Sequence, residues 1–324
     1  MFTALQLLDD VNSYISKLQY NRTPKGLYDP IEYVLSLGGK RIRPVLMLMA
    51  YNLYKDDVST VMSQAVALET YHNYTLLHDD LMDRSDMRRG KATVHKVWNE
   101  NTAILSGDAM LVLAYQFLTR NTPAHLDEIL GLFSQTALEI CEGQQFDMEF
   151  ETRENVTADE YIEMIRLKTA VLLAASLKIG AILAGASTAD ADALYTFGMQ
   201  IGIAFQLKDD FLDVYGNPEL FGKNIGGDIL CNKKTFMLIK ALERADEAQR
   251  KELLTWISKA DYNPLEKIEV VTDLYDKIGI KNVCENKMRE HYMQGIASLL
   301  EVNLPVEKTL ELKNFAEHLM YREM

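Results

Sequence analysis

The sequence predicts an all-α fold, and three observations lead to that expectation. Apolar residues recur at three-to-four spacing, the period of one helix face, through most of the chain. No stretch shows the strict alternation of a half-buried strand. Only seven Pro and 17 Gly interrupt the 324 residues, which favours long helices. We find no linker or low-complexity tract, so we expect a single domain over residues 1–324.

The expected helices follow one another with short breaks between them. They cover residues 3–18, 41–54, 58–83, 101–119, 124–151, 158–186, 188–214, 233–258, 264–277, 280–301 and 305–322. Thr157 precedes one of these segments and is a typical helix N-cap residue. The two longest irregular stretches, residues 84–92 and 215–231, are rich in Gly and positive charge. This composition is typical of loops that close over a ligand.

Composition and charge argue against several classes of protein. The chain is 48% hydrophobic and 25% charged, as in an ordinary globular protein, and its net charge of −13 argues against a nucleic-acid partner. No uncharged apolar run reaches about 18 residues, so we expect no membrane span. The N-terminus lacks the pattern of a secretion signal. Three cysteines without metal-ligand spacing fit a reducing, cytoplasmic setting.

Two similar acidic motifs, "HDDLMD" and "KDDFLD", each follow a long apolar helix. The first contains Asp79, Asp80 and Asp83, and the second contains Asp209, Asp210 and Asp213. The first and third carboxylates of each motif are four residues apart and share one helix face. Like charges at that spacing destabilise a helix, and burial costs far more. A divalent metal removes the conflict. Hard oxygen ligands with open coordination positions suit Mg²⁺, which commonly shares its shell with substrate phosphates.

One such motif alone is more often a solvated surface feature. Two further Asp-Asp pairs, at 9–10 and 56–57, lack the third Asp, and we interpret them as surface. Two copies of the full motif, each followed by a basic, Gly-containing loop, favour a metal site instead. Two clusters facing each other across a bundle would hold one polyanion through several Mg²⁺ ions.

Basic residues near these motifs are candidate phosphate ligands. They are Lys40 and Arg43 in "LGGKRIRP", Arg88 and Arg89 in "MRRG", Lys168 in "RLKTA", Lys223 in "FGKNIGGD" and Lys233 in "CNKKT". Arg binds phosphate through two parallel hydrogen bonds, and Lys acts as a point charge. Each alone is more often a surface cation. Lys168 is the best single candidate, because apolar residues follow it. Lys40 and Arg43 are three apart, so we expect them on one face of the helix that begins there.

Neutral polar residues extend the pattern. His72 lies seven residues before Asp79, two helical turns away on the same face. A lone helical His usually packs in the core, but this face leads to the acidic cluster and favours ligand contact. The remaining members of the pattern are Thr169, Gln206, Gln144 and Asp147.

Taken together, these motifs resemble those of the trans-isoprenyl diphosphate synthases. The family's GGKR-x-RP, DDxxD with an Arg pair, GQ-xx-D, KT, QxxDDxxD, GK-xx-G-x-D and Lys-x-Thr occur here in order over residues 38–235. The set is highly specific, although each motif alone is weak. The resemblance implies an all-α bundle around a deep central cavity, assembled as a homodimer.

The resemblance also implies roles for individual residues. Lys40, Arg43, His72 and Arg89 would hold isopentenyl diphosphate, and Asp79, Asp83 and Asp209 would ligate three Mg²⁺ ions, with Asp80 and Asp213 in support. Arg88, Lys168, Lys223 and Lys233 would bind the allylic diphosphate, with Thr169 and Gln206 nearby. The implied reaction is ionisation of dimethylallyl, geranyl or farnesyl diphosphate, attack by the isopentenyl double bond, and loss of a proton.

Product length depends on the depth of the pocket below the first motif. Tyr74 lies about 7.5 Å before Asp79 along the helix, and Tyr71 about 12 Å before it. A ring at either position would block the growing tail, although both rings also fit ordinary core packing. In the family, an aromatic at the position of Tyr74 goes with short products. We therefore expect a C15 or C20 product, farnesyl or geranylgeranyl diphosphate.

Two other functions stay open at this point. A terpene cyclase also binds a diphosphate through Mg²⁺, but the second Asp motif and the basic site of Lys40, Arg43 and His72 argue against it. A non-catalytic partner subunit tends to lose an Asp motif, whereas this chain keeps both. The chain departs from the family pattern at Asn232, where Gly is usual, and in its final residues "YREM", which replace a basic tail.

Overall fold

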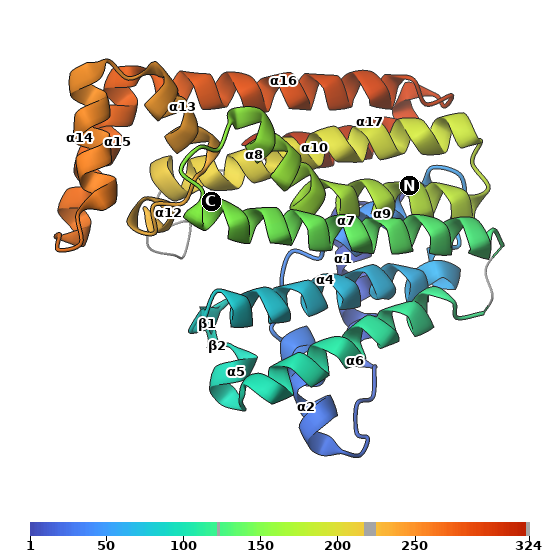
Figure 1. Ribbon diagram of the computed structural model, residues 1–324. Coiled ribbons are helices and arrows are strands. Elements are labelled where there is room, and N and C mark those ends of the chain that lie inside the picture. Colours follow the sequence, from blue (N-terminus) through green and yellow to red (C-terminus); the bar gives the residue numbers. More distant parts are fainter. Residues whose placement is uncertain (122–123, 217–224, 322–324) are drawn as a thin grey trace. The chain divides into compact units, whose positions relative to one another are not determined.

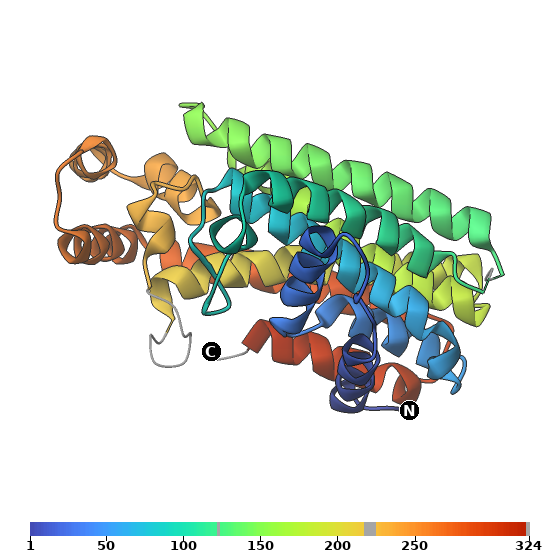
Figure 2. The ribbon, with the colours of Figure 1, turned by 90° about the horizontal axis from the view of Figure 1, so that it is seen from below.

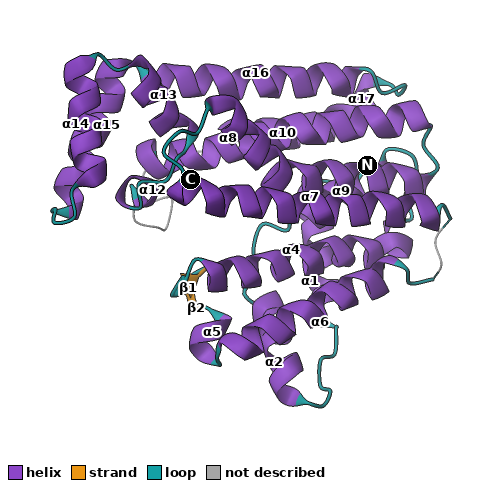
Figure 3. Ribbon diagram, in the orientation of Figure 1, coloured by secondary structure: helices purple, strands orange, loops and turns teal. Residues whose placement is uncertain are grey.

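The computed structural model describes residues 1–121, 124–216 and 225–321, and it confirms the all-α prediction (Figure 3). The helices are α1 (Ala4–Ser16), α2 (Lys25–Ser36), α3 (Ile42–Asn52), α4 (Met62–Met82), α5 (Val94–Val97), α6 (Glu100–Leu118), α7 (Leu126–Thr152), α8 (Ala158–Ile165), α9 (Val171–Ala184), α10 (Thr188–Tyr215), α12 (Gly227–Leu230), α13 (Phe236–Arg244), α14 (Glu247–Ser258), α15 (Pro264–Ile278), α16 (Ile280–Leu300) and α17 (Val306–Tyr321). A 3-10 turn (Val58–Val61) precedes α4, and a π-helical segment (Arg166–Ala170) joins α8 to α9.

Several short elements were absent from the sequence prediction. The helices α5 and α12 have four residues each, too few to show a period, and α2 contains Pro30, which argues against a helix in the sequence. The loop at 84–92 contains a small antiparallel hairpin of β1 (Met87–Arg88) and β2 (Lys91–Ala92), whose two-residue strands are too short to show the alternation of a strand in the sequence.

Two of the long predicted helices are divided. The segment 233–258 breaks between α13 and α14, where Asp246 and Gln249 form a capping box that starts a new helix. The segment 158–186 begins at the predicted cap Thr157, which pairs with Glu160 in a second capping box. It then passes through the π-helical segment.

The chain divides into two compact units. Unit 1 comprises Met1–Ser134, Ala175–Leu194 and Asn303–Leu312, and unit 2 comprises Gln135–Ala174, Tyr195–Val302 and Lys313–Met324. A single domain over 1–324, with a deep central cavity, stays a prediction.

The core of unit 1 is built around α3 and α4. Every residue of α3 except Arg43 is buried, and α4 is buried on all sides from Met62 to Tyr71. Helix α4 runs beside α6 (Figures 1 and 2), and α1 contributes Leu7, Val11 and Ile15, one residue per turn. The last two turns of α4, which carry the first acidic motif, extend beyond this buried part.

In unit 2, α14 and α15 form a pair of neighbouring helices that is joined to α12, α13 and α16 (Figure 1). The apolar face of α15 buries Val271, Leu274 and Tyr275. The turn between α12 and α13 lies against this pair, and it carries Lys233.

One continuous helical stretch among the described residues, Ala158–Ala184, is long and apolar enough to cross a membrane by length and composition. Its mean hydropathy reaches 1.8, but 83% of the apolar window is buried inside the protein. Burial of this kind is typical of a core helix.

Candidate active site

The first acidic motif occupies the end of α4 in unit 1. Asp79 and Asp80 lie in the last helical turn, and Asp83 is the C-cap residue. Asp80 is buried and accepts hydrogen bonds from Arg88 on β1, with Nη2 to Oδ1 at 2.6 Å and Nε to Oδ1 at 3.0 Å. Burial raises the pKa of the Asp80 carboxyl, and the hydrogen bond from Arg88 opposes that shift. The hairpin therefore brings a cation back onto the middle carboxylate of the motif.

Arg88 and Asp80 form a close ion pair, with Asp79 Oδ2 at 3.6 Å from the same guanidinium. In this arrangement Arg88 neutralises part of the acidic motif. Its predicted contact with the allylic diphosphate stays a prediction and requires the guanidinium to serve both groups or to leave Asp80.

Arg89 lies over the Gly38–Gly39 turn at the start of the basic segment. Its Nη1 donates a hydrogen bond to the Gly38 carbonyl oxygen. Gly39 has a φ of 129°, and a Cβ at this position would lie 2.8 Å from the Arg89 guanidinium carbon. The glycine therefore permits both the turn and the approach of Arg89.

His72 lies within the electrostatic reach of these cations. Although part of the side chain stays accessible, desolvation lowers the pKa of His72 well below its usual value, and the charges of Arg43 and Arg89 lower it further. A neutral imidazole is thus expected beside two guanidinium groups. His72, Arg43 and Arg89, three of the four residues predicted to hold isopentenyl diphosphate, are therefore electrostatically coupled within unit 1.

Lys40, the fourth of these residues, is placed differently from the prediction. Helix α3 begins at Ile42, so Lys40 precedes the helix and does not share a helix face with Arg43. The cause is Arg41, which has a left-handed backbone (φ 47°, ψ 36°) and ends the turn before the helix begins. Lys40 is exposed.

Arg41 is a residue that the sequence interpretation missed. Its side chain is 2% exposed, and Nη1 donates to Glu69 Oε1 on α4 at 2.7 Å. Nη2 donates to the Leu35 carbonyl oxygen at 2.6 Å, and Asn73 Nδ2 donates to the same Glu69 oxygen at 2.8 Å. This buried ion pair ties the basic turn to α4, three residues before His72. The available signal was its place between Lys40 and Arg43.

The two tyrosines below the first motif differ in burial. Tyr71 is 1% exposed and its ring packs edge-on against Phe133, with centroids 5.1 Å apart. Tyr74 is only half-buried and lies between Tyr71 and His78, with centroids 5.4 Å and 4.8 Å away. Tyr71 therefore has an evident packing role. The role of either ring in product length stays a prediction.

In unit 2, Asp147 on α7 forms ion pairs with two of the predicted phosphate ligands. Lys168 Nζ lies 2.6 Å from Asp147 Oδ2, and Lys233 Nζ lies 4.0 Å from the same oxygen. Burial alone would raise the pKa of Asp147, but the charges of Lys233 and Lys168 hold it below its usual value. One carboxylate between two ammonium groups leaves one excess positive charge, which suits a diphosphate.

Lys168 and Thr169 belong to the π-helical segment, and π-helical turns occur frequently at functional sites. Gly143 on α7 approaches this segment so closely that a Cβ there would lie 2.4 Å from the Lys168 backbone nitrogen. The two neighbouring residues contact different helices, because Lys168 pairs with α7 while Thr169 Oγ1 donates to Gln206 Oε1 on α10 at 3.1 Å.

The second acidic motif is held by a hydrogen-bond network within unit 2. Asp210 is 4% exposed and accepts hydrogen bonds from Gln206 Nε2, at 3.0 Å, and from the Tyr161 hydroxyl. Burial raises the pKa of Asp210, and the neighbouring Asp228 carboxylate adds to the shift. Asp213 Oδ2 accepts from the Asp228 backbone N–H at 2.9 Å. Tyr161 was missed by sequence reasoning, since a lone Tyr in a helix carries no signal.

The remaining predicted residues are placed as follows. Asp209 is half-buried on α10, one residue before Asp210, and Gln144 and Asp147 lie on α7 as expected. Asn232 has a φ of 53°, a left-handed conformation that Asn adopts more readily than most residues with a side chain. Lys223 lies outside the described residues, as do the last three residues of the "YREM" end.

A divalent cation would find hard oxygen donors at both motifs. Among the described residues, no group of three or more His, Cys, Asp or Glu side chains is assembled around one point. Asp79 and Asp83 are four residues apart at the end of α4, so they offer part of a coordination shell. Mg²⁺ usually takes one or two carboxylates and completes its shell with water and substrate phosphate. The donor set therefore fits Mg²⁺.

Comparison with known proteins gives a consistent picture. The polyprenyl synthetase family model matches residues 24–277. A geranylgeranyl diphosphate synthase of Methanosarcina mazei is 38% identical over 315 residues, 97% of this chain and 95% of that protein. A short chain isoprenyl diphosphate synthase of Methanocaldococcus jannaschii is 44% identical over 254 residues, 77% of this chain and 75% of that protein.

The fold is shared with solved structures. The crystal structure of a geranylgeranyl pyrophosphate synthase matches with a TM-score of 0.94 and 40% sequence identity, covering 100% of both chains. Because the family model covers most of the chain and the relatives are similar nearly end to end, this chain belongs to the polyprenyl synthetase family of prenyltransferases.

Proposed function

We propose that this protein condenses isopentenyl diphosphate with an allylic diphosphate and releases a short-chain prenyl diphosphate. The observation that carries the proposal is in unit 1, where Arg89 bonds to the Gly38 carbonyl oxygen, the charges of Arg43 and Arg89 help to lower the pKa of His72, and α4 carries both His72 and the first acidic motif. A terpene cyclase has no use for this second diphosphate site.

The protein's own residues would act mainly by binding and neutralising charge. Lys40, Arg43 and Arg89 would bind the isopentenyl diphosphate, with His72 as a neutral donor. Lys168 and Lys233, held together by Asp147, would bind the allylic diphosphate and oppose its developing negative charge. No protein nucleophile is needed, because the isopentenyl double bond attacks the allylic cation, and the leaving diphosphate can accept the proton that is then lost.

Mg²⁺ would supply further neutralisation of the leaving group when bound. We propose that Asp79, Asp83 and Asp209 hold it, three ions per active site, with Asp80 and Asp213 in support. Asp80 would act by holding Arg88, and Asp213 by holding the start of α12 through the Asp228 amide.

For the product we propose a C20 chain, geranylgeranyl diphosphate, with C15 as the shorter outcome that the sequence also allows. Two of the similar proteins are geranylgeranyl diphosphate synthases. Tyr74 is the ring that would limit the tail, since Tyr71 is committed to packing against Phe133.

A homodimer and a cytoplasmic location belong to the same proposal. Helix α6 exposes Ile104, Leu105 and Val112, an apolar surface that a second copy would cover. The described residues include all three cysteines, and none of the three forms a disulfide bond, as is usual in a reducing compartment.

The test is incubation of the purified protein with Mg²⁺, isopentenyl diphosphate and, in turn, dimethylallyl, geranyl and farnesyl diphosphates, with chromatography of the products. The expected result is incorporation of isopentenyl units up to C20. Release of a cyclic hydrocarbon without isopentenyl consumption would instead identify a cyclase, and no consumption at all would identify a partner subunit.

A matched pair of variants tests the acidic motif itself. The double variant D79N/D83N is expected to lower turnover by at least about a hundredfold, because it removes electrostatic stabilisation of the leaving group. The control D9N/D10N changes an exposed Asp pair on α1 and should leave turnover unchanged. Equal effects of the two double variants would contradict a catalytic role for the motif.

A further inference from the structure

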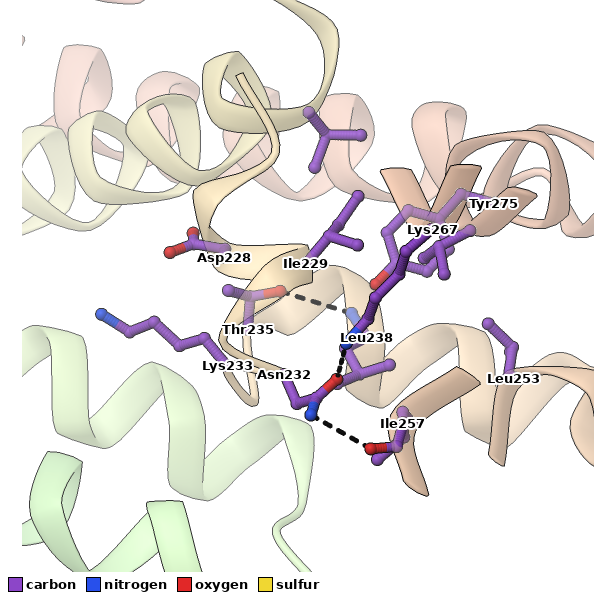
Figure 4. A pocket seen from close by; sticks show the side chains of 12 residues that line it. Asp228, Ile229, Asn232, Lys233, Thr235, Leu238, Leu253, Ile257, Lys267 and Tyr275 are labelled. Carbon is purple, nitrogen blue, oxygen red and sulfur yellow. Dashed lines mark hydrogen bonds between the residues drawn. The ribbon is translucent and has the colours of Figure 1, made fainter. Parts of the chain in front are cut away.

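Lys267 is a lysine that none of the family motifs includes, yet it is 1% exposed. Figure 4 shows its side chain extending toward Asn232. It lies in the first turns of α15. Its ammonium donates to Asn232 Oδ1 at 2.7 Å and to the Leu230 carbonyl oxygen at 3.4 Å, and it lies 4.3 Å from the centre of the Tyr262 ring. Burying an ammonium group is costly unless its donors are used. The contacts shown supply neutral acceptors and an aromatic face.

The contacts of Lys267 converge on one short turn, residues 230–233, between α12 and α13. The Leu230 carbonyl oxygen also accepts from the Tyr262 hydroxyl at 3.1 Å. Asn232 donates through Nδ2 to the Ile257 carbonyl oxygen at 3.1 Å, near the end of α14. The turn is therefore anchored to α14 and α15 by side chains, as the dashed lines of Figure 4 show for Asn232.

Asn232 has a left-handed backbone conformation, which an L-residue with a side chain adopts at some cost. Its side-chain oxygen accepts a hydrogen bond from Lys267, and its side-chain nitrogen donates one to the Ile257 carbonyl oxygen. These two hydrogen bonds hold the side chain in place and thereby stabilise the backbone direction at this position. A glycine would adopt the same backbone without any such anchor.

The direction of the chain at Asn232 decides where Lys233 points. Lys233 is the next residue, and its ammonium lies 4.0 Å from Asp147. On the other side of the turn, the Asp228 amide is bound to Asp213 of the second acidic motif. The anchored turn thus lies between two parts of the proposed diphosphate site.

We propose that Lys267 is a positioning residue that, acting through Asn232, orients Lys233 toward the diphosphate of the allylic substrate. The inference rests on the proposed function, because it assigns Lys267 to the allylic site of that reaction. A purely structural lysine would stabilise α14 and α15 without affecting the affinity for one substrate.

The test uses Lys267→Met, Asn232→Gly and the double variant, with Lys277→Met as the control. Lys277 lies on the same helix but is 61% exposed and pairs with Asp273. We expect K267M to raise the KM for the allylic diphosphate about tenfold, the loss expected when one charged contact to phosphate is weakened. The KM for isopentenyl diphosphate should stay within about twofold of that of the parent protein, whereas kcat should fall as well, because Lys233 is also proposed to oppose the charge that develops on the leaving group.

The second variant keeps the proposal testable if K267M folds poorly. N232G retains the left-handed turn and removes only its anchor, so it should raise the same KM. Because the two residues act in series, the double variant should be no worse than the more impaired single variant. An unchanged KM for the allylic diphosphate, or an equal rise in both KM values, would show a structural role and overturn the proposal.

A binding measurement separates this inference from the proposed function. Titration calorimetry of inorganic pyrophosphate with Mg²⁺ should show about tenfold weaker binding to K267M than to K277M. If the parent protein consumes no isopentenyl diphosphate, the proposed function fails, and this comparison still decides the role of Lys267. Equal pyrophosphate affinities for the two variants would overturn the positioning role even in an active synthase.

Discussion

The buried pair of Arg41 and Glu69 gives a prediction whose size follows from the structure. Both side chains are 2% exposed and their charged atoms are 2.7 Å apart. Arg41→Met would leave the Glu69 carboxylate buried with only Asn73 as a donor, and Glu69→Met would leave the guanidinium buried. Removing one partner of a buried ion pair typically costs about 3 to 5 kcal/mol.

The double variant R41M/E69M should behave differently from either single variant. Both buried charges disappear together, and two methionines fill similar space. The remaining cost is the loss of three hydrogen bonds, from Arg41 to the Leu35 carbonyl oxygen and to Asn12 and from Asn73 to Glu69, about 1 kcal/mol each. The double variant should therefore be more stable than either single variant, with a coupling free energy of at least about 3 kcal/mol.

The measurement is urea denaturation followed by far-ultraviolet circular dichroism, at one fixed protein concentration. Arg153→Met is the matched control, because Arg153 and Glu160 are also 2.7 Å apart but are each 39% exposed. The control should lose less than about 1 kcal/mol. Additive losses in the double variant, or single losses no larger than that of the control, would refute the reasoning.

Three further predictions concern packing, pH and product length. Gly143→Ala should lower the free energy of unfolding by about 1 to 3 kcal/mol and raise the KM for the allylic diphosphate, because the new methyl group displaces the Lys168 backbone. Denaturation measures the first effect and steady-state kinetics the second. A variant with the unfolding free energy and the KM of the parent protein would contradict the close packing. Burial lowers the pKa of His291 to about 4, so the unfolded chain binds the extra proton first and stability falls as pH drops from about 6.5 toward 4. His291→Gln should remove about 2 to 3 kcal/mol of that pH dependence when the free energy of unfolding of both proteins is measured between pH 6.5 and 4. The same dependence on pH in the variant and the parent protein would refute the assignment of this effect to His291. Tyr74→Ala should lengthen the product seen by chromatography, whereas an unchanged product would exclude Tyr74 as the limit of the pocket.

The sequence alone determined the class of fold and the family. Helical periodicity is a local property, so most long helices were located within a few residues of their ends. The acidic motifs could be identified equally well, because the spacing of their Asp residues follows from the geometry of a single helix. The short helices α5 and α12 were not readable, since four residues show no period.

The tertiary structure decided which charges meet. Arg88 pairs with Asp80, Asp147 collects Lys168 and Lys233, and Lys267 reaches Asn232 across 35 residues of sequence. Arg41 resembled its neighbours Lys40 and Arg43 in the sequence, yet its side chain is buried against Glu69, 28 residues away. Such pairings depend on how helices pack, because an ion pair is fixed by the distance between side chains and by their burial, and neither quantity is local to the sequence.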